Sequence, residues 1–247
     1  MVRILVLLLL ILAVLISPVS AQGKVRLVVM DGINLEHLTD PALTNFRFLL
    51  EYGAVGLANA NTAGGRTPEN TALTLGSGSR ALGPGGGYVL HWDDEMESSL
   101  AGDVQTRRTG ILPPQGSLVV PAIAQIADAN ADLMHTVQVG YLAATLDAGG
   151  RTVAALVNAD THEINRPAAA IVADVNGIIQ AGQVGQDLLQ KDPSQPFGLQ
   201  SDLAQFVAGL QQLDETDFVV IDLGDTSRAL SYSGYVLEEI NLASRLR

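Results

Sequence analysis

Three apolar stretches of this chain end in aspartate, and carboxylates in that position can do chemistry. They are VRLVVM before Asp31, TVAALV followed closely by Asp160, and FVVID, which ends in Asp222. If these stretches are parallel strands, their carboxyl ends meet at one edge of a sheet, where α/β proteins bind ligands. Aspartates gathered there can hold a metal ion or a phosphate-bearing substrate. Alternatively, Asp31 caps the next helix, as Asp225 can do after the third stretch.

A second candidate group is Arg66-Thr67-Pro68. Proline directly after threonine favours the start of a helix, with the threonine side chain as its N-cap. The first turn of a helix also presents free backbone N–H groups to an anion. The segment therefore predicts a helix start that can bind a negatively charged group.

Histidine and cysteine contribute little to a transition-metal site in this sequence. Cysteine is absent, which excludes disulfides, thiol nucleophiles and thiolate ligands. Of the four histidines, His162 follows closely after Asp160, and a surface histidine is the simpler interpretation. His91 precedes a cluster of acids at residues 93–97. That cluster is either a cation site or, more simply, part of a solvated insertion loop.

The composition indicates an α/β protein that does not bind nucleic acid. The 247 residues are 47% hydrophobic and only 4% aromatic, and they carry a net charge of −12. That length allows one α/β core, and scarce aromatics fit helices layered on a parallel sheet. General nucleic-acid binding needs basic patches, which an acidic chain does not offer. An anionic small molecule remains possible, because a bound metal ion reverses the local field.

The first 21 residues have the layout of a secretory signal peptide. Arg3 precedes an uninterrupted apolar core at residues 4–16, Pro18 follows, and Val19-Ser20-Ala21 forms a small-residue cleavage site. We expect the mature protein to begin near Gln22 and to be secreted, periplasmic or otherwise extracytoplasmic. The alternative is an uncleaved leader that associates the protein with a membrane or the cell envelope.

Residues 22–247 predict a single α/β domain, a three-layer α/β/α arrangement around a mostly parallel sheet. The expected strands share a short apolar run and are residues 25–30, 54–60, 152–157, 168–175 and 218–222. The expected helices share apolar spacing of three and four and are residues 43–52, 69–75, 117–129, 139–148, 199–213 and 234–247. The run at 25–30 reads as a central strand covered on both faces. We expect a polar insertion around residues 83–116, and a chain that stops inside a helical pattern suggests a truncated protein.

Taken in order, several segments resemble the amino-terminal part of the alkaline phosphatase superfamily, which includes sulfatases, nucleotide pyrophosphatases and cofactor-independent phosphoglycerate mutases. The segments are VRLVVMDGIN, LTNFRFLLEYGAVGLANANTAGGRTPENTALTLGSGSRA and TLDAGGRTVAALVNAD. The resemblance covers roughly residues 25–160 and, more loosely, 218–228. It consists of a strand ending in aspartate, a helix with Asn45, Leu49 and Gly53, and a segment of threonine-proline type before a helix.

The resemblance implies an alkaline-phosphatase-like fold and metal-dependent transfer of a phosphoryl or sulfuryl group. It implies that Asp31 ligates a divalent ion, zinc or manganese. Asp222 and Asp225, which lie at another strand end, could supply further carboxylate ligands. The resemblance also implies Thr67 as the nucleophile, and Arg66 and Asn70 as contacts to a small phosphate or sulfate ester. In a gap-free alignment the nucleophile position falls on Arg66, so Thr67 as a plain helix cap stays open.

Two alternatives to an active hydrolase follow from this pattern. A chain with Arg66 at the nucleophile position and no Asp-His motif can keep the fold without catalysis. It would then act as a binding or scaffold module of the envelope. The other alternative is that the remaining metal ligands lie beyond Arg247 in a longer protein.

Overall fold

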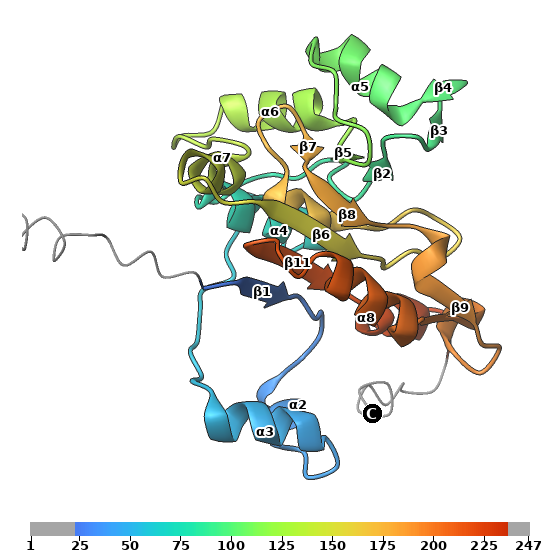
Figure 1. Cartoon of the computed structure of the whole chain (residues 1–247). Helices are drawn as coiled ribbons and strands as arrows, with labels where there is room; N and C mark the ends of the chain where they lie inside the picture. The colour runs from blue at the N-terminus through green and yellow to red at the C-terminus, as the bar shows by residue number, and fades with distance from the viewer. Residues whose placement is uncertain (1–22, 237–247) are drawn as a thin grey trace, which may run out of the picture.

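The centre of the molecule is a four-stranded sheet in which every neighbouring pair is parallel (Figure 1). We describe it from a computed structural model covering residues 23–236. The strands in spatial order are β1 (Val25–Val28), β11 (Phe218–Asp222), β6 (Val153–Val157) and β8 (Ala181–Gln183). The prediction of an α/β protein with a mostly parallel sheet is therefore confirmed.

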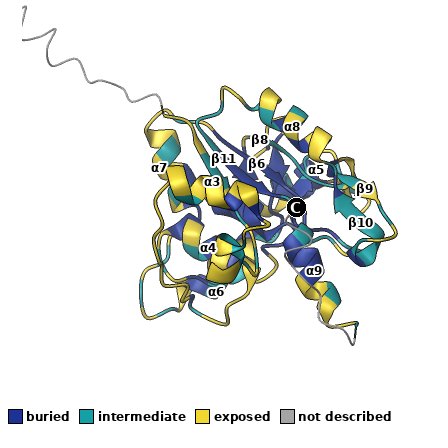
Figure 2. Cartoon of the chain, turned by 90° about the horizontal axis from the view of Figure 1, so that it is seen from below, coloured by how far each residue is buried: buried dark blue, intermediate teal, exposed yellow. Residues whose placement is uncertain are grey.

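Apolar side chains cover both faces of β6 and β11, as expected for parallel strands whose sequences are continuously apolar. Val153, Ala155 and Val157 pack with α4 (Pro68–Ser77) and η1 (Pro167–Val172) on one face. Ala154 and Leu156 pack with Phe206 of α8 (Leu203–Gln212) on the other face. Figure 2 shows β6 and β11 buried and the outer sides of α7 and α8 exposed.

The first strand is at the edge of this sheet, so the prediction that it is central and covered on both faces is wrong. β1 pairs only with β11, and Val25 and Val28 are 48% and 45% exposed. An apolar run indicates that a segment can be buried, but it does not determine which strands pair with that segment. The chain next forms α2 (Leu35–Thr39) and α3 (Thr44–Tyr52), which lie below β1 in the view of Figure 1, apart from the sheet.

Two other predicted strands are also wrong. Residues 54–60 are exposed and pair with nothing among the described residues. Residues 168–175 fall largely in η1, a 3₁₀ helix. Pro167 at its first position fixes a helical φ, and the three alanines that follow have low strand propensity. The main chain of Ile171 also lies where a side chain on Gly76 of α4 would stand, so η1 and α4 pack closely.

The predicted polar insertion contains more structure than a solvated loop. Residues 83–87 form an irregular glycine-rich loop. They lead into β2 (Leu90–His91), β3 (Glu95–Met96), β4 (Ser99–Leu100) and α5 (Ala101–Thr109). β2 continues through β5 (Leu118–Val119) to β7 (Ile178–Ile179) in an antiparallel sheet. Leu90, Ala101 and Val119 give this region its own small core, which polar composition alone conceals.

The other elements complete the two sides of the sheet. They are α6 (Ile123–Ala131), α7 (Tyr141–Ala148), η2 (Gln186–Leu188), β9 (Leu189–Lys191), η3 (Pro196–Gly198), β10 (Leu199–Ser201) and α9 (Asp225–Ser233). The helices expected at 117–129 and 199–213 thus each begin later, after a short strand. The helix expected at 234–247 starts in a turn, and its residues from 237 on lie outside the described part of the chain, as does the predicted signal peptide. No helix within residues 23–236 has the length and apolar character needed to cross a membrane.

Candidate active site

Asp31 and Asp222 come together at the carboxyl edge of the sheet, as the sequence predicts. Asp222 ends β11, and Asp31 follows the neighbouring strand β1 at a turn that Gly32 makes with φ +71°. The Asp222 side chain is nearly inaccessible, with the residue 4% exposed. Burial, and secondarily the carboxylate of Asp31, raises the pKa of Asp222 to about 7. This site therefore does not easily accept a negative charge on both carboxylates. A bound proton or cation relieves the repulsion between them.

A hydroxyl group fixes the position of Asp31. Oδ2 of Asp31 accepts a hydrogen bond of 2.5 Å from Ser227, in the first turn of α9. The Ser227 residue is only 8% exposed. Sequence reasoning missed Ser227; its only signal is its position shortly after the strand end at Asp222.

Asp225 is hydrogen-bonded to Arg228 and does not cap the helix that it begins. Gly224, not Asp225, is the N-cap of α9, with φ +77°, so the capping prediction is wrong. A side chain on Gly224 would meet the carbonyl oxygen of Asn158 at 2.1 Å, so the close approach of α9 to β6 requires glycine here. Oδ1 of Asp225 accepts hydrogen bonds from Arg228 at 2.8 Å and from the backbone of Ser201 at 3.0 Å. This oxygen is already committed to a guanidinium group.

Asp160 lies at the same edge but is neutralised. Its two carboxylate oxygens accept three hydrogen bonds of 2.7–3.0 Å from the guanidinium of Arg166. Both residues are buried, at 2% and 5% exposure. Arg228 also donates to the carbonyl oxygens of Asn158 and Asp160. Neither arginine was predicted as part of the site, because no local pattern marks them.

The fit to a divalent cation rests on Asp31 and Asp222. Carboxylate oxygens are ordinary ligands of zinc and manganese, and two repelling carboxylates favour a cation. Within residues 23–236, however, no three His, Asp or Glu side chains gather as a metal site would require. The predicted trio of Asp31, Asp222 and Asp225 therefore does not form a ready three-ligand cluster.

Thr67 lies at the helix start, as predicted. It is the N-cap of α4, where its Oγ accepts a hydrogen bond of 3.2 Å from the backbone of Asn70, and Pro68 occupies the first turn. The capping interpretation of Thr67 is confirmed, while its role as nucleophile stays a prediction. The Asn70 side chain donates to the Gly65 carbonyl and accepts from the Gly83 amide. Arg66 is exposed and donates to the side chain of Asn61 at 3.3 Å.

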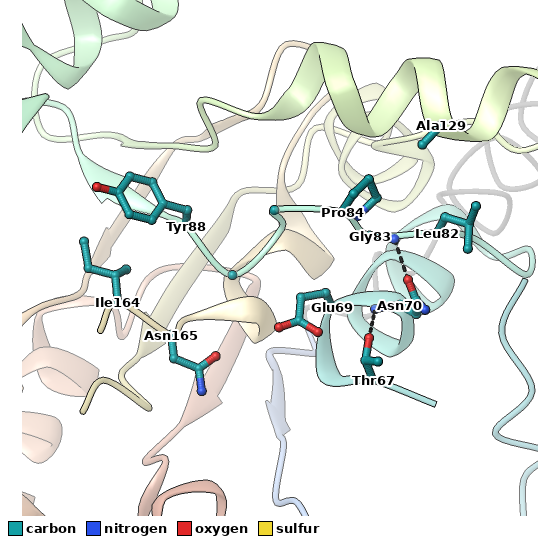
Figure 3. Close-up of a pocket in the computed structure, with 12 residues that line it drawn as sticks. Thr67, Glu69, Asn70, Leu82, Gly83, Pro84, Tyr88, Ala129, Ile164 and Asn165 are labelled. Carbon is teal, nitrogen blue, oxygen red and sulfur yellow. Dashed lines mark hydrogen bonds between the residues drawn. The ribbon is translucent and has the colours of Figure 1, made fainter. Parts of the chain in front are cut away.

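A pocket of about 580 Å³ opens beside Thr67 (Figure 3). Its walls come from the start of α4, the glycine-rich loop, α6 and the segment before η1. Its polar and apolar lining includes Thr67, Glu69, Asn70, Pro84, Tyr88, Ile164 and Asn165. The backbone N–H of Asn165 donates to Asp160 at 2.9 Å, which ties one pocket wall to the edge of the sheet.

The structure thus holds two groups of candidate residues. Asp31, Asp222 and Ser227 form one, and Thr67 with the pocket forms the other. Across the described part of the chain, no hydrogen bond or ion pair directly joins Thr67 to Asp31 or Asp222. Comparisons of the chain with protein-family models, with curated proteins and with solved structures find no match.

Proposed function

We propose that this protein is an exported, metal-dependent hydrolase of small phosphate or sulfate esters, with a three-layer, alkaline-phosphatase-like fold. The observation that carries the proposal is the pairing of Asp31 with buried Asp222. Two carboxylates that repel each other at the end of adjacent strands favour a divalent cation, zinc or manganese in this proposal. Apolar cover on both faces of β6 and β11 supports the layered arrangement, and the leader at residues 1–21 supports export.

The residues divide the chemistry between them. Asp31 and Asp222 would hold the cation, which neutralises charge developing on the transferred group. Thr67 would attack phosphorus or sulfur through Oγ, the bond to the ester oxygen would break, and the hydroxyl proton would pass to that departing oxygen. Water would then displace the transferred group from Thr67 and complete the hydrolysis. The Thr67 oxygen accepts the Asn70 amide hydrogen, so the hydroxyl proton is available for transfer. Arg66 and the free N–H groups of α4 would bind the non-bridging oxygens.

A second candidate is a binding or scaffold module without catalysis. Three observations favour it: Thr67 serves as a helix cap, Asp225 is paired with Arg228, and no three-ligand cluster forms within residues 23–236. A module of this kind would bind one divalent ion or none, and it would turn over no phosphate or sulfate ester.

Substitutions at Thr67 can separate the nucleophile from the cap. Asparagine caps helices as well as threonine does but cannot attack phosphate. We expect the wild type and Thr67→Ser to release nitrophenol from nitrophenyl phosphate or nitrophenyl sulfate with added zinc or manganese. Thr67→Asn should keep the melting temperature and lose activity by a factor of about 10³ or more. Asp31→Asn should lose both activity and metal, measured by elemental analysis.

The matched control is Asp128→Asn, an exposed aspartate on α6 that should change neither activity nor metal content. Metal binding that depends on Asp31, without turnover of any ester, would support the binding module instead. Activity that survives in Thr67→Asn would remove Thr67 from the proposal. Absence of both metal and activity in the wild type would contradict the proposal of a metal-dependent hydrolase.

A further inference from the structure

The pocket beside Thr67 carries polar groups that the fold itself does not use. Glu69 forms no ion pair within residues 23–236, and neither Lys nor Arg lines the pocket. Asn165 forms hydrogen bonds through its backbone, and its side-chain amide forms none with the part of the chain that the structure describes. Tyr88, 43% exposed, adds a phenolic hydroxyl at the pocket wall. These groups are arranged in a concave site, where polar side chains usually orient a ligand.

Gly87 lies close to two of these groups. A methyl group added at Gly87 would stand 3.6 Å from Oε1 of Glu69 and 3.6 Å from Oδ1 of Asn165. The polar ends of both side chains therefore lie beside the same glycine at the pocket wall. The floor is formed by glycine although the backbone of Gly87 is not in the left-handed region, so its conformation alone does not require glycine.

The hydrogen-bonding groups of the lining side chains indicate which class of ligand the pocket can bind. Glu69 is the one charged side chain among these lining residues, and its carboxylate accepts hydrogen bonds from hydroxyl groups. Asn165, Thr67 and Tyr88 each both donate and accept, which matches hydroxyl groups better than an ammonium group, a donor only. Pro84 and Ile164 offer apolar surface to C–H groups. The volume of about 580 Å³ lies within the range of small-molecule sites, roughly 300–1,000 Å³.

We propose that this pocket binds a hydroxyl-rich ligand of the carbohydrate class, with its hydroxyls held by Glu69 and Asn165. The proposal concerns binding and does not depend on hydrolysis of an ester or on a metal at Asp31. Loss of the hydrolase proposal would therefore leave it standing.

Saturation-transfer NMR on the wild-type protein tests the proposal directly. The probes are the methyl glycosides of glucose, galactose and mannose, with choline as the comparator. We expect saturation transfer to at least one glycoside and none to choline. Signal for choline alone, or for no probe, would overturn the assignment.

Two substitutions locate the binding. Gly87→Ala fills the space over the loop with only ordinary van der Waals contacts, so it should fold normally and weaken glycoside binding at least about tenfold. Glu69→Gln keeps the shape, removes the charge and should weaken binding by about tenfold. Gly56→Ala, where an added methyl has no neighbour within 4 Å, is the matched control and should bind as the wild type does. Glycoside binding that survives both pocket substitutions would place the ligand elsewhere and contradict the proposal.

Discussion

Asp160 and Asp222 stand at the carboxyl ends of adjacent strands, β6 and β11, and both are almost fully buried, at 2% and 4% exposure. Their surroundings differ in the sign of the nearest charge. Asp160 faces the guanidinium of Arg166, while Asp222 faces the carboxylate of Asp31. The first aspartate belongs to a closed ion pair, and the second has a pKa raised to about 7 by burial and by its neighbour.

The contrast separates structural from functional acids at one sheet edge. A buried carboxylate that is paired and fully hydrogen-bonded has no capacity left for a ligand. A buried carboxylate beside another one has a strong preference for a proton or a cation, as catalytic sites often do. Both aspartates follow a strand, so that position alone does not predict which one is paired with an arginine and which one lies beside another carboxylate.

Arg228 lies between the two environments and belongs mainly to the first. It donates to main-chain carbonyls after β6 and to the carboxylate of Asp225. Its charge lowers the pKa of Asp222, but burial and Asp31 outweigh it. The excess negative charge therefore remains concentrated on Asp31 and Asp222.

Removal of the Asp160 carboxylate should give the largest loss of stability. Asp160→Asn leaves the buried guanidinium of Arg166 without its counter-ion, which should cost about 3–5 kcal/mol in the free energy of unfolding. Urea unfolding followed by circular dichroism at neutral pH measures it. The double variant Asp160→Asn with Arg166→Gln should recover part of the loss, because it removes the unpaired charge. A loss below about 1 kcal/mol for the single variant would show that Asp160 is not needed to neutralise the buried guanidinium of Arg166.

Removal of the Asp222 carboxylate should change the pH dependence of stability. Its pKa in the folded protein, about 7, lies above its ordinary value of 3.8, so the folded state binds the extra proton. The stability contributed by that proton is complete below about pH 4 and is lost as pH rises through about 7. Relative to Asp222→Asn, the wild type should lose up to about 4 kcal/mol between about pH 4 and pH 8.

Urea unfolding of both proteins across that pH range measures the difference. The control variant Asp128→Asn, exposed on α6, should run parallel to the wild type. If the curve of Asp222→Asn also runs parallel to that of the wild type, Asp222 has no raised pKa. The contrast with Asp160 would then disappear.

The sequence predicts the parts of this fold that depend on neighbouring residues. Thr67 and Pro68 start α4, and the apolar runs of β6 and β11 form strands, because capping and apolar patterning act locally. The edge position of β1 was not predictable in the same way, since Val25 pairs with Phe218 across most of the chain. η1 replaced a predicted strand because a proline start outweighed an apolar run.

The same division holds for the site. Parallel strand ends share one edge, so Asp31 and Asp222 could be placed together from the sequence. The partners that give each acid its character could not, because they depend on side-chain packing in three dimensions. Ser227 reaches Asp31 across 196 positions of the chain, and even Arg166, six residues after Asp160, carries no local signal.

Of the three changes, at Asp160, Asp222 and Ser227, removal of the Ser227 hydroxyl should cause the smallest loss of stability. It should affect Asp31 and leave the ion pair of Asp160 with Arg166 intact. Ser227→Ala deletes the 2.5 Å hydrogen bond to Asp31, and hydrogen bonds to charged groups contribute about 1.5–3 kcal/mol. Urea unfolding at about pH 8 should show a loss in this range. Ser233→Ala, on the exposed end of the same helix and bonded only to a main-chain carbonyl, should cost less than about 0.5 kcal/mol. Equal losses for the two serines would mean that the hydroxyl of Ser227 does not stabilise the Asp31 carboxylate. The environment of Asp31 and Asp222 would then differ less from that of Asp160 than their contacts indicate.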